Sequence, residues 1–180
     1  MKRLIILIIF CLCLPGIGSA EEMCKYEGND IRKVNDKAVE TSTGLLADGL
    51  WCTYHRNGVL SAAIPFKIGM IEGIARLYSE KGVLKTEEPY KNGRIEGIKR
   101  AYYENGTLKD EIPYKNDIKE GIQRSYYESG KLQGEVSFKM GVAEVARTYY
   151  ESGKLLGESF FKNGVEETRR IYDENGKLMP

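Results

Sequence analysis

Histidine is almost absent from this sequence of 180 residues, in which His55 is the only one. No serine lies in a Gly-x-Ser-x-Gly context, and no glycine-rich loop that could cradle a phosphate opens a helix. His55 occupies a position of an internal repeat that elsewhere holds serine, tyrosine or aspartate, which indicates a solvated strand end rather than a general base. We therefore expect a protein that is not an enzyme and has no cofactor. The alternative is an enzyme whose catalytic groups form no recognisable motif.

An excess of charge of one sign is also missing. The chain has 27 basic and 26 acidic residues, a formal net charge of +1. A nearly neutral protein exerts no long-range attraction on nucleic acid or anionic lipid. The sequence therefore predicts no nucleic acid partner, and a lipid surface would have to be bound through a local patch of charge.

Long apolar runs are confined to the N-terminal residues. Lys2 and Arg3 precede the apolar run 4–14, and small residues follow up to Ala20. This pattern is typical of a secretory signal peptide that is cleaved after Ala20. The run is too short for a transmembrane helix, which needs about 20 apolar residues. We therefore expect an exported protein that is periplasmic, on the cell surface or secreted.

Cysteine is scarce, and two of the four residues, Cys11 and Cys13, lie in the predicted signal peptide. The exported chain keeps Cys24 and Cys52, and an oxidising compartment favours a disulfide between them. Two unrelated buried thiols are the alternative. Two cysteines and His55 do not complete a set of four ligands, so we expect no metal site.

Internal repetition is the strongest signal in the sequence. Four units, spaced by 24 residues, begin at Gly49, Gly73, Gly97 and Gly121, and two more, spaced by 23, begin at Glu144 and Glu167. The tenth residue of every unit is glycine and the twelfth is leucine. An aromatic residue followed by lysine stands at the eighteenth position of the complete units. The sixth residue is always tyrosine: Tyr54, Tyr78, Tyr102, Tyr126, Tyr149 and Tyr172.

The residues between these marks predict strands. Tyr, Ile, Val and Phe alternate with polar residues, and glycine preceded by asparagine or serine suits hairpin turns. In the third unit, residues 104–106 fit a three-residue loop that pairs Tyr103 with Thr107 and Tyr102 with Leu108. The predicted fold is all-β, an elongated single-layer antiparallel β-meander built from about six tandem β-hairpin repeats of 23–24 residues.

The domain organisation follows from the limits of the repeat. Residues 21–48 match the repeat poorly and carry Cys24, so we expect them to cap the first unit. We expect a signal peptide at 1–20, an N-terminal cap segment at 21–48 and the repeat array at 49–180.

The hairpin register also predicts which residues share a face of the sheet. If alternation continues unbroken, one face carries Ile98, Arg100, Tyr102, Leu108, Asp110, Ile112 and Tyr114. A unit that is one residue shorter would reverse this alternation. We therefore expect a bulge or bend near 143–145 and again near 166–168.

The pattern G-I-x-R-x-Y-Y-E-x-G-x-L, followed by Y/F-K-x-G, resembles the MORN-repeat variant found in many bacterial proteins, including those labelled as the YwqK family of antitoxins. The resemblance covers Gly49–Pro180, about three quarters of the chain. It implies an array that serves as a binding surface, because MORN arrays are associated with scaffolding and with contact to membranes or phospholipids. An antitoxin-like role for an exported chain implies a partner that is itself secreted.

Arginine recurs at the fourth position of the units and, by alternation, lies beside the tyrosine of the sixth. Such a row could grip a carboxylate-rich or phosphate-bearing partner. Alternatively, and in our preferred interpretation, each arginine lies over a neighbouring ring and pairs with the glutamate four residues earlier, Glu72, Glu96 or Glu120. The candidate partner-binding residues are Arg76, Arg100, Arg124, Arg147, Tyr78, Tyr102, Tyr126 and Tyr149.

A second row consists of the lysines that follow each aromatic residue: Lys67, Lys91, Lys115, Lys139 and Lys162. These lysines could hold an anionic surface such as lipid headgroups. The interpretation that we prefer is that they keep the turns soluble and discourage edge pairing.

Together these features predict an exported, non-enzymatic repeat protein that acts as a protein–protein interaction scaffold, antitoxin-like or immunity-like, with another protein as its partner. A sheet rich in tyrosine and arginine suits this role, because these residues dominate binding energy when they are buried at an interface. The alternative is a module that binds a membrane surface or phospholipid headgroups.

Overall fold

The computed structural model describes residues 24–27, 30–35 and 37–180. The predicted signal peptide, 1–20, lies outside these residues. Eleven strands form the main array: β4 (Gly49–Tyr54), β5 (Leu60–Lys67), β7 (Gly73–Tyr78), β8 (Leu84–Lys91), β10 (Gly97–Tyr102), β11 (Leu108–Lys115), β13 (Gly121–Tyr126), β14 (Leu132–Lys139), β15 (Val142–Tyr149), β16 (Leu155–Lys162) and β17 (Val165–Ile171).

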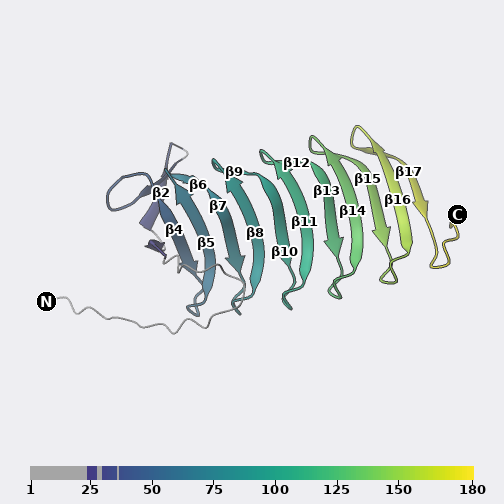
Figure 1. Cartoon of the computed structure of the whole chain (residues 1–180), viewed down its shortest axis with the longest axis horizontal. Coiled ribbons are helices and arrows are strands. Elements are labelled where there is room, and N and C mark those ends of the chain that lie inside the picture. The colour runs from purple at the N-terminus through teal and green to yellow at the C-terminus, as the bar shows by residue number, and fades with distance from the viewer. Residues whose placement is uncertain (1–23, 28–29, 36) are drawn as a thin grey trace.

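These strands lie side by side in chain order, each antiparallel to the next, in one open sheet (Figure 1). Three short strands, β6 (Met70–Ile71), β9 (Arg94–Ile95) and β12 (Ile118–Lys119), extend the pairing of the strand before each of them. The predicted all-β meander of tandem hairpins is confirmed. Within the described ranges there is no helix long and apolar enough to cross a membrane.

Described residues between Cys24 and Ala47 contact the first repeat. Strand β1 (Tyr26–Glu27) pairs in parallel with β4, and β2 (Ile31–Val34) and β3 (Lys37–Glu40) form a separate two-stranded sheet. Cys24 and Cys52 form the predicted disulfide. The Ala38 N–H donates to the Gly69 carbonyl at 2.7 Å, which ties β3 to the array. That 21–48 acts as a cap stays a prediction.

The hairpin loop of the third unit has the predicted form. The Tyr103 N–H donates to the Thr107 carbonyl at 2.8 Å, and Gly106 closes the loop with a φ of +83°. Glycine adopts this left-handed conformation without the steric penalty of a Cβ atom. At the other end of the strands, Asn92 and Gly93 both have positive φ, as a tight two-residue hairpin turn requires.

The hairpin of each of the five complete repeats contains a β-bulge that the sequence analysis missed. Tyr102 lies opposite Leu108, as predicted, but Ala101 lies opposite Asp110. Lys109 therefore has no partner in the ladder, and the residues beyond it change faces. The predicted face is therefore wrong for the residues of β11 that follow Lys109.

The bulge moves the charged residues of the second strand. Arg100 lies opposite Glu111, whereas unbroken alternation would place Asp110 there. Ile112 lies opposite Lys99, so it points to the face away from Arg100. The face that carries Arg100 is called the arginine face below.

The bulges predicted in the shorter units are present. Ser137 pairs with Val145 while Phe138 pairs with Ala143, which leaves Glu144 as an extra residue. The ladder between β16 and β17 shifts in the same way between Phe160 and Phe161. A single-residue bulge thus absorbs the missing residue and keeps β15 continuous.

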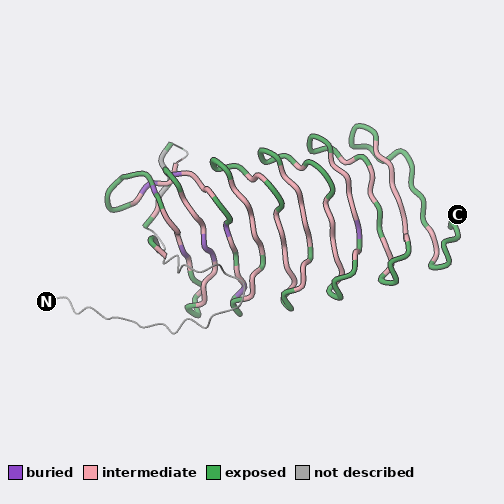
Figure 2. The backbone as a smooth tube through the Cα atoms, viewed as in Figure 1, coloured by how far each residue is buried: buried purple, intermediate pink, exposed green. Residues whose placement is uncertain are grey.

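Very little of the described part of the chain is buried, because a single-layer sheet has no second layer to cover it. The buried apolar residues gather toward the N-terminal end: Val39, Ala47, Cys52, Ala62, Ala63 and Ala75. Figure 2 shows that most strand residues beyond this end are half-buried and that the turns are exposed. Both faces of the C-terminal two thirds of the array are therefore available for contact.

Candidate functional site

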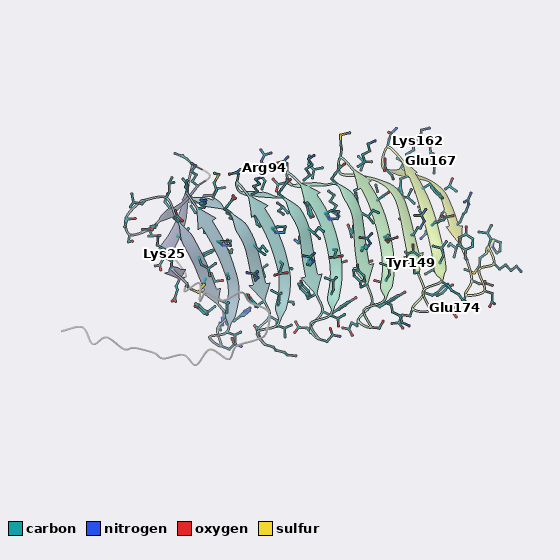
Figure 3. All side chains as sticks on the ribbon, viewed as in Figure 1. Lys25, Arg94, Tyr149, Lys162, Glu167 and Glu174 are labelled. Atoms are coloured by element: carbon teal, nitrogen blue, oxygen red, sulfur yellow. A yellow bond between two sulfur atoms is a disulfide. The ribbon has the colours of Figure 1, made fainter. Side chains whose placement is uncertain are left out.

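The sheet register places the repeated arginines in one row that crosses the strands. Because an arginine of one strand lies opposite a glutamate of the next, the two charges alternate from β7 to β17. In order, this Arg–Glu row consists of Arg76, Glu87, Arg100, Glu111, Arg124, Glu135, Arg147, Glu158 and Arg170. Side chains project along the whole length of the sheet (Figure 3).

The arginines are paired with glutamates of their own hairpins. The Nε atoms of Arg76, Arg100 and Arg124 each lie 3.0 Å from Oε1 of the glutamate opposite. A directly opposed pair of unlike charges stabilises a sheet by about 0.2–1 kcal/mol. These arginine side chains are about 40% exposed, so each of the three arginines is partly open to a partner.

The prediction that each arginine pairs with the glutamate four residues earlier is wrong. The reason is that these glutamates lie where the chain passes from one repeat to the next and accept backbone N–H groups there. Their hydrogen bonds run from Asn92 to Glu72 at 2.6 Å, from Asn116 to Glu96 at 2.7 Å and from Met140 to Glu120 at 2.6 Å. Each such glutamate therefore fixes the turn of the following repeat.

The tyrosines of the sixth position join the same row. Tyr102 donates its hydroxyl hydrogen bond to Glu87 Oε2 at 2.9 Å, while Oε1 of Glu87 accepts from Arg76. The arrangement recurs with Tyr126 on Glu111 at 3.2 Å and with Tyr149 on Glu135 at 3.3 Å. One carboxylate thus links the arginine of one repeat to the tyrosine of the next.

Sequence reasoning missed these linking glutamates although the repeat contains a signal for them. Glutamate stands at the fifteenth position of the second to fifth units: Glu87, Glu111, Glu135 and Glu158. The first unit has Ala63 there, and the row begins only after it. The structure therefore brings the candidate arginines and tyrosines together through residues that the sequence analysis did not single out.

Burial and the carboxylate change the acidity of the row tyrosines. Burial, together with the hydrogen bond to Glu87, raises the pKa of Tyr102 from 10.0 to about 12. On the opposite face, burial and the hydrogen bond to Glu88 raise the pKa of Tyr90 to about 12. The folded protein holds the Tyr102 proton more tightly than the unfolded chain, so this contribution to stability is complete below pH 10 and is lost as the pH rises through about 12.

Replacing Glu87 with glutamine is expected to lower the pKa of Tyr102 while leaving that of Tyr90 near 12. The pKa of Tyr102 stays above 10.0, because burial is the largest cause of its shift and persists. Glu88→Gln is the matched control, since it should change Tyr90 instead. NMR titration of ring-labelled tyrosine measures both values, and an unchanged Tyr102 in Glu87→Gln would contradict the linkage.

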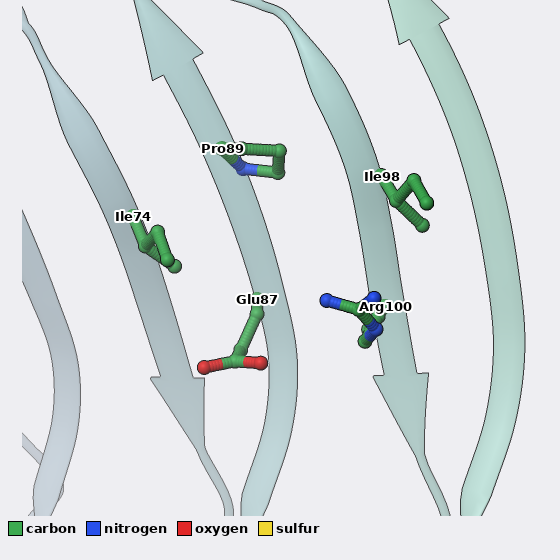
Figure 4. A pocket seen from close by; sticks show the side chains of 5 residues that line it. All are labelled: Ile74, Glu87, Pro89, Ile98 and Arg100. Atoms are coloured by element: carbon green, nitrogen blue, oxygen red, sulfur yellow. The ribbon is translucent and has the colours of Figure 1, made fainter. Parts of the chain in front are cut away.

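A row of isoleucines runs beside the Arg–Glu row on the arginine face. Ile74, Ile98 and Ile122 are 43%, 43% and 46% exposed, and Ile74 and Ile98 each lie opposite a proline. Between Ile74 and Ile98 the surface is hollowed. Figure 4 shows the hollow at β7, β8 and β10, which Ile74, Glu87, Pro89, Ile98 and Arg100 line.

His55 has a structural role that the sequence analysis did not foresee. Its ring Nε2 lies 3.0 Å from the Tyr78 carbonyl oxygen of the next repeat, so it is not merely a solvated strand end. Tyr103 and Tyr127, at the same repeat position, donate their hydroxyls to the carbonyls of Tyr126 and Tyr149. The position joins neighbouring repeats.

The remaining predicted residues do not form a site with this row. The lysines of the second row end their strands at exposed turns: Lys67, Lys91, Lys115, Lys139 and Lys162. Among the residues that the structure describes, no three His, Cys, Asp or Glu side chains are grouped so that they could hold a metal ion.

The fold and this row define a class of protein: a tandem β-hairpin repeat array with an open, periodic face. The chain belongs to the MORN repeat variant family. The family model matches five successive stretches, residues 47–67, 71–92, 95–116, 119–140 and 145–163, which together make up more than half of the chain. No curated protein matches the chain closely enough to count as a relative.

Proposed function

We propose that this chain is an exported, non-enzymatic repeat protein that binds another protein through its arginine face. The observation that carries the proposal is the row of half-exposed isoleucines, Ile74, Ile98 and Ile122, beside the Arg–Glu row. A surface that combines exposed apolar side chains with neighbouring arginine and tyrosine has the composition of a protein interface.

The paired charges favour a protein over a membrane as the partner. Each guanidinium from Arg76 to Arg147 lies opposite a carboxylate, so the row has almost no net field to attract anionic headgroups. The lysines that could supply such a field stand at the turns, away from the row. The disulfide between Cys24 and Cys52 supports export, because such bonds persist in oxidising compartments.

A crosslinking pull-down against envelope and secreted fractions of the source organism tests this function. We expect the native protein to enrich one partner, and Arg100→Ala combined with Arg124→Ala to reduce its capture about tenfold or more, as loss of central interface residues does. The matched control is Lys99→Ala with Gln123→Ala, which alters neighbouring residues on the opposite face and should capture the partner normally.

The other outcomes separate the alternatives. If no protein is captured, or if both double variants lose it equally, the arginine face is not the protein-binding site. Binding to anionic liposomes that weakens as salt is raised would instead favour the membrane-surface module.

A further inference from the structure

The arginine face repeats the same arrangement of isoleucine and arginine from one repeat to the next, and the groove between Ile74 and Ile98 lies within this arrangement. Each repeat contributes two neighbouring strands, and strands in a sheet are about 4.8 Å apart. Successive isoleucines such as Ile74, Ile98 and Ile122 are therefore about 9.6 Å apart across the sheet. A partner that follows the row must present its own apolar groups at the same step.

The distance of about 9.6 Å between successive isoleucines favours one of the regular conformations that a partner chain can adopt. A polyproline II helix has three residues per turn and rises 3.1 Å per residue, so its side chains repeat about every 9.3 Å. The seven-residue repeat of an α-helix measures about 10.5 Å, which drifts by about 3 Å over the three steps from β7 to β15. In an extended strand, residues of one face recur about every 6.7 Å. The polyproline II helix alone keeps step with the array.

The chemistry of the groove agrees with this geometry. Ile74, Pro89 and Ile98 offer an apolar floor, and the flanking charges Glu87 and Arg100 belong to a row that neutralises itself. A neutral segment is therefore the electrostatic complement of this face, because it leaves the ion pairs undisturbed. A polyproline II helix has no internal hydrogen bonds, so its carbonyls can accept from the half-exposed guanidinium groups.

We propose that the arginine face binds a neutral, proline-rich segment in the polyproline II conformation. The segment runs across the strands from β7 to β15, one turn per repeat. Every third side chain packs beside the apolar residue that stands two positions before the arginine of each repeat: Ile74, Ile98, Ile122 and Val145. This inference rests on the proposed function and names the class of protein segment that the face recognises.

Calorimetric titration with synthetic peptides tests the match in step. The protein is expressed from its full-length sequence and purified with the disulfide formed. The probe is four copies of Pro-Pro-Leu, and the control peptide has the same residues with leucine spacings that alternate between two and four. We expect the regular peptide to bind about tenfold or more tightly than the control, and shorter regular peptides to bind progressively less well.

A pair of variants locates the bound peptide. Ile98→Ser with Ile122→Ser should weaken binding of the regular peptide about tenfold, whereas Lys99→Ser with Gln123→Ser on the opposite face should not. Because both isoleucines are more than 40% exposed, the variant should still fold, and its thermal unfolding checks this. Equal affinity for the two peptides, no binding of either, or loss in the Lys99 and Gln123 variant would overturn the inference. If a crosslinked partner still depends on Arg100 and Arg124, the proposed function survives that failure.

Discussion

Gly97→Ala is expected to destabilise the middle of the array by roughly 2–3 kcal/mol. Gly97 has a φ of +115°, outside the region that residues with a Cβ atom adopt. A Cβ atom there would also lie 3.2 Å from Cγ of Pro89 in the preceding hairpin. Hydrogen exchange of the backbone amides of β8 and β10 measures the loss, because each repeat can open without global unfolding.

Gly106→Ala is the matched control for this prediction. Gly106 also has a positive φ, +83°, but no atom lies within 4 Å of its added Cβ. The left-handed conformation costs a residue with a Cβ atom roughly 1–2 kcal/mol, and no close contact adds to it. Equal destabilisation by the two variants would show that the contact with Pro89 and the unusual φ of Gly97 do not matter.

The repeat made the strands and turns predictable. Glycine at the tenth position marks a loop that requires a left-handed residue, and Gly106 has that conformation. The spacing of 24 residues limits each unit to one hairpin, so the meander follows from the sequence pattern. The bulge at Glu144 was predictable for a related reason, because a unit with one residue fewer must restore its alternation.

The bulge after each hairpin loop was not predictable from the residues that form it. The extra residue varies in type among the hairpins: Ser61, Lys85, Lys109, Gln133 and Leu156. No residue type is common to the five bulge positions, so the sequence contains no side-chain signal for the bulge. This missed bulge also caused the error in the candidate site, because the unpaired residue decides which residue of the next strand lies opposite Arg100.

The arginine and tyrosine rows were identified correctly as neighbours, but the glutamates that join them by hydrogen bonds were not. Sequence spacing within one strand suggested an arginine partner such as Glu96, four residues before Arg100. The actual partner, Glu111, stands on the next strand, 11 residues later. Pairs across a ladder depend on register, and register was the part of the fold that the sequence left uncertain.

Cys24→Ser is expected to destabilise the N-terminal end of the protein by about 3–4 kcal/mol, the loop-entropy value for a disulfide of this span. The bond joins residues separated by 28 positions, and it anchors the segment that includes β1 to the fully buried Cys52 of β4. Removing Cys24 breaks the bond without placing a new polar group in the buried position. Hydrogen exchange of β1 and β4, compared with the protein under reducing conditions, measures the effect.

The loss should be local, because each hairpin contacts mainly its neighbours in the array. Amides of β4 and β5 should exchange much faster in Cys24→Ser, while those of β14–β16 keep their native protection. Cys52→Ser is the comparison variant, and it should be more destabilising since it also buries a hydroxyl at a site with no exposure. Faster exchange spread evenly to β16 would mean that the array unfolds as one unit, and the additive picture of repeat stability would then be wrong for this protein.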